Sequence, residues 1–331
     1  MISRPALLFL IVCFHSNCRQ NNETIISVTG PVSANDLGTS LPHEHIIVDF
    51  IGADSITPGR YDPDSAFRKA VPFLHELKKQ KCNSLFDCTP NYLGRDVKLL
   101  ERLSKATGIN IITNTGYYGA VKHKYLPKHV IEDSPAQIAE RWINEFRNGI
   151  DGTTIKPGFI KLSADYSPLS PLQKKTLEAG ALTHHKTGLT IAVHSGDGNA
   201  AREELGILME NNVPPHAFIW VHAQNEKDRE YFTEIAGKGA WVEFDGLSAE
   251  NIEEYVSILK FMKKKKLLHR TLVSHDAGWY AVGEKDGGQF RGYTTLFTHL
   301  LPALEKEGFS KKEIDQIIRS NPATAYSVKD Y

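Results

Sequence analysis

The sequence predicts an α/β fold, a (β/α)8 TIM barrel, from three observations. Short β-branched or aromatic runs alternate with stretches of helical periodicity along residues 24–331, without a linker or a break in composition. The runs are apolar throughout, as in parallel strands that are covered on both faces. Glycines typical of helix ends stand just before three of the runs, at Gly108, Gly188 and Gly239. A single barrel domain over residues 24–331 is therefore expected.

Each expected element follows from its local pattern. The apolar runs predict strands at 45–50, 84–88, 109–115, 158–163, 189–194, 217–222, 240–244 and 271–275. Apolar residues at helical spacing, such as Phe67, Val71 and Leu74, predict helices at 65–81, 96–107, 136–148, 173–187, 200–211, 225–237, 249–266 and 310–320. A short β-hairpin precedes the barrel, with strands at 25–28 and 37–39 and a turn at Gly30 and Pro31.

The composition excludes several classes of protein. The chain has 331 residues, with 39 Lys and Arg against 39 Asp and Glu, so its formal net charge is zero. Without a net basic field, a nucleic acid is not expected as its partner. The hydrophobic content of 41% excludes general disorder. The remaining expectation is a globular protein whose partner is a small molecule.

The N-terminus is typical of a secretory signal. Arg4 precedes an apolar run at 6–14, and polar residues follow at 19–23, which predicts a signal peptide over residues 1–17. Cys18 is then either a lipid-attachment cysteine or an ordinary residue of the exported chain. We expect an exported protein that is either periplasmic or anchored to a bacterial membrane. The only membrane attachment that we expect is a lipid anchor at Cys18.

Six side chains stand where a TIM barrel carries its active site, at or near the C-terminal ends of strands: His43, His45, Lys161, His194, His222 and Asp276. Alternation along a strand directs both His43 and His45 into the barrel and Glu44 away from it. Lys161 lies within an apolar run, so its amine must be neutralised, paired or modified. A single histidine or aspartate of this kind is usually structural. The combination of all six predicts a metal centre.

Several motifs carry a family resemblance. They are residues 28–31 (Val-Thr-Gly-Pro), 41–45 (Leu-Pro-His-Glu-His), 94–96 (Gly-Arg-Asp), 115–118 (Thr-Gly-Tyr-Tyr), 159–161 (Phe-Ile-Lys) and 321–323 (Asn-Pro-Ala). In these motifs the chain resembles the phosphotriesterase family of the amidohydrolase superfamily, over nearly all of residues 24–331.

This resemblance implies a binuclear metal centre. His43, His45 and Asp276 would hold the more buried ion, and His194 and His222 the more exposed one. Lys161, carboxylated by CO2 to N6-carboxylysine, would bridge both ions together with a hydroxide. Imidazole and carboxylate ligands suit Zn²⁺ best, with Mn²⁺, Co²⁺ or Fe²⁺ as alternatives. The resemblance also suggests a homodimer.

The same resemblance implies a hydrolase in which the bridging hydroxide attacks a lactone or another carboxylic ester and Asp276 accepts its proton. Tyr118 stands where lactonases of the family carry a tyrosine near the metals. Its hydroxyl would then bind the lactone ring or the leaving alkoxide. Alternatively, Tyr118 is an ordinary packed aromatic side chain. The main alternative is a phosphoric ester hydrolase, but Asn225 and Gly246 replace the aspartate and histidine of the paraoxon-cleaving type. An alternative of another class is a catalytically silent, secreted binding barrel.

The predicted substrate pocket consists of six loop residues: Tyr117, Tyr166, Asp245, Trp279, Tyr280 and Arg291. Asp245 would hydrogen-bond a ligand, line the pocket or cap the next helix. Arg291 would meet an anionic group on the substrate or pair with an acidic neighbour. The polar character of these loops favours a polar, sugar-derived lactone over one with a long acyl chain.

Overall fold

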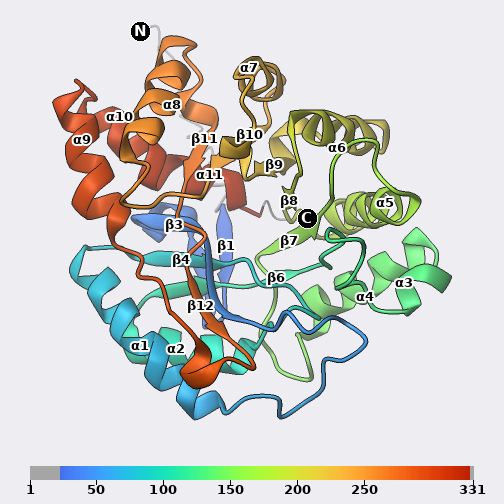
Figure 1. Cartoon of the computed structure of the whole chain (residues 1–331). Coiled ribbons are helices and arrows are strands. Elements are labelled where there is room, and N and C mark those ends of the chain that lie inside the picture. The colour runs from blue at the N-terminus through green and yellow to red at the C-terminus, as the bar shows by residue number, and fades with distance from the viewer. Residues whose placement is uncertain (1–22, 329–331) are drawn as a thin grey trace, which may run out of the picture.

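Parallel strands form the wall of a TIM barrel, and helices surround it (Figure 1). The structure, a computed structural model, describes residues 23–328. The predicted signal peptide at 1–17 and Cys18 lie outside the described residues, so export and lipid attachment stay predictions. Among the helices of residues 23–328, none is long and apolar enough to cross a membrane.

The barrel wall consists of two hydrogen-bonded arcs. One arc contains β6 (Asn114–Thr115), β7 (Phe159–Ser163), β8 (Ile191–His194), β9 (Phe218–Val221), β10 (Trp241–Phe244) and β11 (Thr271–Val273). The other contains β3 (Ser40–Val48), β4 (Ser84–Asp87), β5 (Asn110–Ile112) and β12 (Gly278–Ala281). All neighbouring strands in both arcs are parallel, as predicted.

The arcs meet at two junctions, one within a predicted strand and one after a predicted strand. The third strand splits into β5, which pairs with β4, and β6, which pairs with β7. At the other junction, the predicted strand at 271–275 forms β11, which pairs with β10, and a further strand that was not predicted, β12, pairs with β3. Across the second junction, His45 N donates to Ala277 O at 2.8 Å and Asp276 N to His43 O at 3.2 Å. The junction therefore holds Asp276 directly against the histidine-bearing strand.

Most predicted helices are present with small shifts of their ends. They are α1 (Pro63–Lys79), α2 (Val97–Thr107), α4 (Pro135–Asn148), α5 (Pro171–Thr187), α6 (Gly198–Glu210), α7 (Glu230–Gly237) and α8 (Ile252–Lys264). The predicted helix at 310–320 is α10 (Lys311–Asp315) with a π-helical continuation, and α11 (Asn321–Tyr326) follows it. Two further helices, α3 (His129–Glu132) and α9 (Leu301–Lys306), have no counterpart in the prediction.

Side-chain caps fix where the helices begin. The hydroxyls of Ser134 and Ser170 accept hydrogen bonds from the backbone N–H of the third residue of α4 and α5, which are Gln137 and Gln173. In each capping box, the glutamine side chain accepts a hydrogen bond from the backbone N–H of the serine. Both helices have proline in the first turn, where no intrahelical donor is lost. At the other end of α5, Gly188 has a φ of +71°, the left-handed conformation that ends a helix.

The N-terminal hairpin differs in part from the prediction. Strand β1 (Thr24–Ser27) pairs with β2 (Gly30–Ser33), not with residues 37–39. The apolar Leu37 favours a strand at 37–39 in the sequence. In the structure, Leu37 follows a short 3₁₀ turn at Ala34–Asp36 and is buried in the barrel interior. The predicted turn residues Gly30 and Pro31 are therefore the first two residues of β2.

Two groups of apolar side chains stabilise the barrel. The larger group fills the space between the wall and the helices. The smaller fills the barrel interior and consists of Ile25, Leu37, Phe86, Cys88, Ile112, Phe159, Ala192, Ile219, Val221, Trp241, Leu272, Ala325 and Tyr326. Cys88 of this inner group also lines the cavity of the candidate site.

Candidate metal centre

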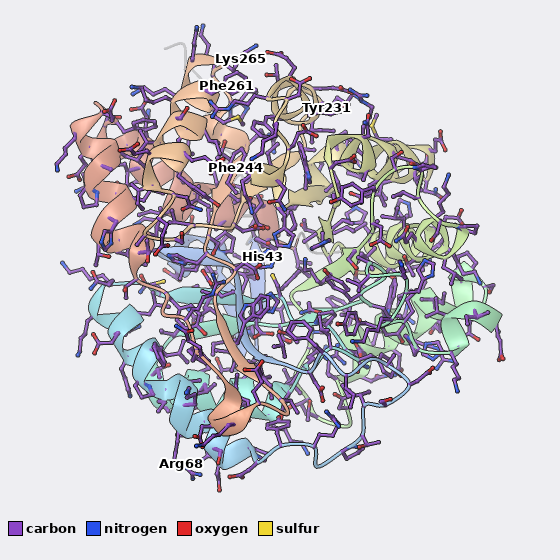
Figure 2. The ribbon with its side chains drawn as sticks, in the orientation of Figure 1. His43, Arg68, Tyr231, Phe244, Phe261 and Lys265 are labelled. Carbon is purple, nitrogen blue, oxygen red and sulfur yellow. The ribbon has the colours of Figure 1, made fainter. Side chains whose placement is uncertain are left out.

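The strand ends bring all six predicted ligands to one cavity of about 140 Å³: His43, His45, Lys161, His194, His222 and Asp276 line it. They come from β3, β7 and β8 and from the residues that follow β9 and β11. Figure 2 shows His43 in the middle of the molecule, inside the ring of helices.

One group of potential ligand atoms consists of His43, His45 and Asp276, whose atoms lie within 4.8 Å of one another. Asp276 Oδ1 lies 3.0 Å from His45 Nε2 and 3.8 Å from His43 Nε2. This oxygen is buried and accepts no hydrogen bond from the described residues. Buried polar atoms are normally satisfied, so an oxygen left open beside two imidazoles fits a divalent cation.

Hydrogen bonds to the outer ring nitrogens hold the imidazoles in place. Thr89 Oγ1 donates to Ile47 O at 2.9 Å, so it must accept a hydrogen bond from His45 Nδ1, which lies 2.7 Å away. His45 Nε2 then carries the free lone pair that a metal requires. Outer partners of this kind orient metal-binding histidines and fix their tautomer.

Asp245 is the hydrogen-bond partner of His222 and lies beside His43, whose Nδ1 is hydrogen-bonded to Glu243 Oε2 at 3.3 Å. Asp245 Oδ2 lies 3.0 Å from His43 Nδ1, and Asp245 Oδ1 lies 2.6 Å from His222 Nδ1. Burial alone would raise the pKa of Asp245, but the adjacent His222 and His43 outweigh it and hold that pKa well below the ordinary value. Of the three roles that the sequence left open, Asp245 has the hydrogen-bonding one, towards His222 instead of a ligand. It lies behind the imidazoles and does not line the cavity.

Lys161 is 2% exposed within β7, between Ile160 and Leu162. The segment after β6 packs tightly against the backbone of Lys161. A Cβ atom at residue 116 would lie 2.2 Å from Lys161 O, and Gly116 has a φ of +114°. Only glycine fits this position, which leads the chain towards Tyr118.

The backbone is strained at two of the six residues. His222 has a φ of +64° and Asp276 a φ of +52°, in the left-handed region that residues with a side chain rarely adopt. Such conformations persist only where the surrounding structure imposes them, and they cluster at functional sites. Both turns direct a potential ligand into the cavity.

Tyr118 lies at the exposed side of the ligand group. Its hydroxyl is 3.1 Å from His194 Nδ1, and the His194 ring centroid lies 4.4 Å from that of His222. Burial raises the pKa of Tyr118, so its hydroxyl stays protonated at neutral pH. Burial lowers the pKa of His194 well below the ordinary value, and His222 and Lys161 lower it further. A neutral imidazole is the form that binds metal.

The predicted pocket residues divide into two groups. Of the six, Trp279 lines the cavity, as does Tyr118, the predicted catalytic residue. The other five lie elsewhere, with Asp245 behind the imidazoles. Tyr166 is 69% exposed, and Tyr117 is buried against Trp142, with its hydroxyl 3.1 Å from His129 Nε2. Tyr280 packs against Tyr61 and Gly287. Arg291 donates to the backbone oxygen of Asp276 instead of pairing with an acidic side chain or facing the cavity.

The remaining cavity wall is apolar and was not predicted. It consists of Val48, Phe50, Cys88, Leu93, Val121 and Tyr125. Phe50 and Tyr125 lie with ring centroids 6.3 Å apart, and Phe50 and Trp279 lie 5.5 Å apart. The sequence gives a signal at Val48, Phe50 and Cys88, which lie in or at the end of predicted strands. Nothing in the local pattern around Leu93, Val121 or Tyr125 indicates a pocket.

A TIM barrel with histidines and an aspartate converging at its strand ends is typical of metal-dependent hydrolases. The model of the phosphotriesterase family matches residues 23–326. The chain belongs to the phosphotriesterase family, and it is a hydrolase of that family. The expected fold and family are thereby confirmed.

Curated relatives match most of the chain. A phosphotriesterase homology protein of Escherichia coli is 27% identical, over 88% of this chain and 99% of its own length. An aryldialkylphosphatase of Saccharolobus solfataricus is 27% identical, over 89% and 97%. An N-acetyltaurine hydrolase of Rattus norvegicus is 25% identical, over 89% and 95%. The relatives therefore span different hydrolase activities.

Solved structures agree with the fold. The organophosphorus hydrolase from Deinococcus radiodurans has a TM-score of 0.82 and is 26% identical, covering 93% of this chain and 98% of its own. A mutant of a PTE-like lactonase from the same organism has a TM-score of 0.83 and is 27% identical, covering 92% and 100%. Both lactonase and organophosphate hydrolase names therefore occur among the neighbours.

Proposed function

We propose that this protein is a metal-dependent hydrolase of lactones or other carboxylic esters. The observation that carries the proposal is the convergence of His43, His45 and Asp276 on one cavity, with the Tyr118 hydroxyl at the cavity's exposed side. The lactonase and phosphatase names among the relatives support hydrolysis at such a site.

The six lining residues fit a binuclear centre. His43, His45 and Asp276 would hold one divalent ion, Zn²⁺ or a similar metal. His194 and His222 would hold the other, and a carboxylated Lys161 would be shared. When bound, the ions would polarise the carbonyl oxygen of the substrate and lower the proton affinity of a water molecule.

The chain itself would supply proton transfer and orientation. With one oxygen beside His43 and His45 for a metal, the Asp276 carboxylate would take the proton of the attacking water on its other oxygen and return it to the leaving oxygen. The Tyr118 hydroxyl stays protonated and would donate a hydrogen bond to the ring oxygen or the leaving alkoxide. The aromatic wall would exclude bulk water and strengthen both interactions.

The apolar wall changes the expected substrate. The sequence favoured a polar, sugar-derived lactone because of its loop residues, but most of those residues lie away from the cavity. Phe50, Leu93, Tyr125 and Trp279 surround the ligand group instead. Apolar walls reward uncharged, apolar substituents. We therefore propose an ester or lactone with a compact apolar substituent.

Phosphotriester hydrolysis is the second candidate, favoured by the names of relatives. The local structure argues against an efficient enzyme of this type. Gly246 stands where the paraoxon-cleaving type carries a histidine, and a Cβ atom there would lie 2.8 Å from Gln224 Nε2. That nitrogen donates to Asp245 Oδ1 at 2.9 Å. A side chain at 246 would therefore displace the Gln224 amide and remove one of the hydrogen bonds that Asp245 accepts.

A substrate panel tests the proposal. Protein reconstituted with Zn²⁺ or Mn²⁺ should hydrolyse lactones and aryl esters with a higher kcat/KM than phosphotriesters, and chelation of the metals should abolish turnover. The measurement is kcat/KM over the panel, with metal content measured in parallel. A preference for phosphotriesters would select the second candidate. Two bound metals without turnover of any substrate would favour the silent binding barrel.

Removal of the Tyr118 hydroxyl separates its two possible roles. Tyr118→Phe keeps the ring against Tyr125 and loses the hydrogen bond near His194. We expect kcat/KM for lactones to fall by on the order of tenfold, the effect of one hydrogen bond at a reacting centre. Tyr117→Phe is the matched control, because its hydroxyl lies outside the cavity. Equal effects of the two variants would make Tyr118 a packed aromatic only.

A further inference from the structure

A short segment beside the cavity has an unusual backbone. Val121, Lys122 and His123 have φ values of +55°, +53° and +64°, so three consecutive residues with side chains form a left-handed turn. L-residues disfavour this conformation, and β-branched valine disfavours it most. No glycine relieves the turn, so interactions outside it must impose it.

The turn joins the walls of the cavity. Val121 is 51% exposed and lines the cavity, and the segment is flanked by Tyr118 and Tyr125, whose ring centroids lie 5.7 Å apart. Lys124 Nζ donates to Phe50 O at 2.6 Å, and Lys124 O accepts from Ala53 N at 3.0 Å. The turn therefore affects the positions of Phe50, on the loop after β3, and of Val121 and Tyr125, on the loop after β6.

Asp165, which follows β7, provides the external interaction. Its Oδ1 accepts from Val121 N at 2.8 Å, and its Oδ2 accepts from Lys122 N at 3.4 Å. Gln173 Nε2 donates to Oδ2 at 3.0 Å and also to Gly119 O at 3.2 Å, which holds the carboxylate against the same segment. Hydrogen bonds from backbone amides to a carboxylate are stronger than those between neutral groups.

Neighbouring contacts attach the segment to the lysine-bearing strand. Ala120 N donates to Ser163 Oγ at 2.8 Å, and Tyr118 forms a parallel bridge with Ser163. A Cβ atom at Gly119 would lie 2.8 Å from Ser163 O. The loop is therefore fixed to the strand up to residue 120. Beyond that residue, Asp165 holds Val121 and Lys122, and Ser170 Oγ lies 2.7 Å from His123 Nε2.

We infer that Asp165 is a positioning residue that sets substrate selectivity by holding Val121–His123 in the left-handed turn. Asp165 does not line the cavity and acts through Tyr118, Val121 and Tyr125. The selectivity part of this inference rests on the proposed esterase function. The turn itself does not.

The principal variant is Asp165→Ala, which removes both acceptor oxygens. We expect KM for the preferred ester to rise by on the order of tenfold, the factor that corresponds to one lost hydrogen bond to a charged group. The effect on kcat should be smaller, because Asp276 and the histidines stay in place. Discrimination between compact and bulky apolar substituents should fall. Asp165→Asn, which keeps one acceptor oxygen, should lie between Asp165→Ala and the wild type.

A second-site change identifies the cause. Lys122→Gly places a residue without conformational penalty at a φ of +53°. If Asp165 acts by imposing this turn, Lys122→Gly in the Asp165→Ala background should restore part of the KM and selectivity, because Val121 and His123 keep their conformational penalty. A merely structural defect would not respond to a glycine at residue 122. Absence of rescue would therefore overturn the inference.

Trypsin cleavage gives a readout that does not depend on activity. Cleavage after Lys122 and Lys124 should be faster in Asp165→Ala than in the wild type, because a released loop is more accessible to a protease. The control is Asp197→Asn, which alters a carboxylate on the same rim that caps α6 and does not line the cavity. Cleavage and KM in Asp165→Ala equal to those of this control would overturn the inference. Faster cleavage in a protein that hydrolyses no ester would support the role in the turn and refute the proposed function and the selectivity role with it.

Discussion

Asp276→Asn should lower kcat for the preferred ester by about 10²- to 10⁴-fold, the usual contribution of a general acid–base residue. The amide keeps an oxygen near His45 Nε2, so a ligand atom remains, but an amide does not accept a proton at neutral pH. Metal content should therefore fall much less than turnover. The measurement is kcat together with the number of metal ions per chain.

The expected loss is specific to the group that faces the cavity. Asp197→Asn is the matched control, and it should keep kcat within about twofold, since surface caps contribute mainly to helix stability. Near-normal turnover of Asp276→Asn with both metals bound would contradict the proton-transfer role. Loss of the metals along with turnover would make Asp276 a ligand only.

Lys161→Met should have opposite effects on activity and on stability. The change removes the amine that would be carboxylated, so kcat/KM should fall by more than about 10²-fold, beyond what removal of an outer-shell partner costs. In the metal-free protein the same change replaces a polar group that is 2% exposed with an apolar one of similar length. The Tm of the metal-free protein should therefore rise by about 2 °C or more.

Metal content, kcat/KM and thermal unfolding after chelation measure these effects, and intact mass of the wild type should show one added CO2. A wild-type mass without this addition and a Lys161→Met variant with full activity would contradict the bridging role. Lys156→Met, at an exposed position before the same strand, controls for the loss of a positive charge.

The ligand group could be predicted because it depends on regular structure. Alternation along β3 places His43 and His45 on one face, and the barrel architecture brings the ends of β8 and β9 to the same rim. The path of a loop has no such periodicity. Tyr117 and Tyr118 are neighbours in the sequence, yet Tyr118 bridges to β7 and lines the cavity while Tyr117 bridges to Asn91 and packs against Trp142.

The support of the ligands was harder to predict for a different reason. Asp245 and Thr89 act on histidines that are far away in the sequence, and a hydrogen bond between two strand ends leaves no local pattern. The apolar wall was hard to predict for the same reason, because Phe50 and Tyr125 are far apart in the sequence and meet only in the folded chain. These contacts required the three-dimensional structure.

The inner core described above has a consequence for how the protein folds. It contains Ile25 from the start of the described chain and Tyr326 from its end. The Tyr326 hydroxyl donates a hydrogen bond to Pro42 O, and the Tyr326 ring packs on Phe86 with centroids 4.2 Å apart. Contacts between residues this distant in the sequence form late and slow the folding reaction. During synthesis, the strand that carries His43 and His45 therefore lacks part of its packing until residue 326 has left the ribosome.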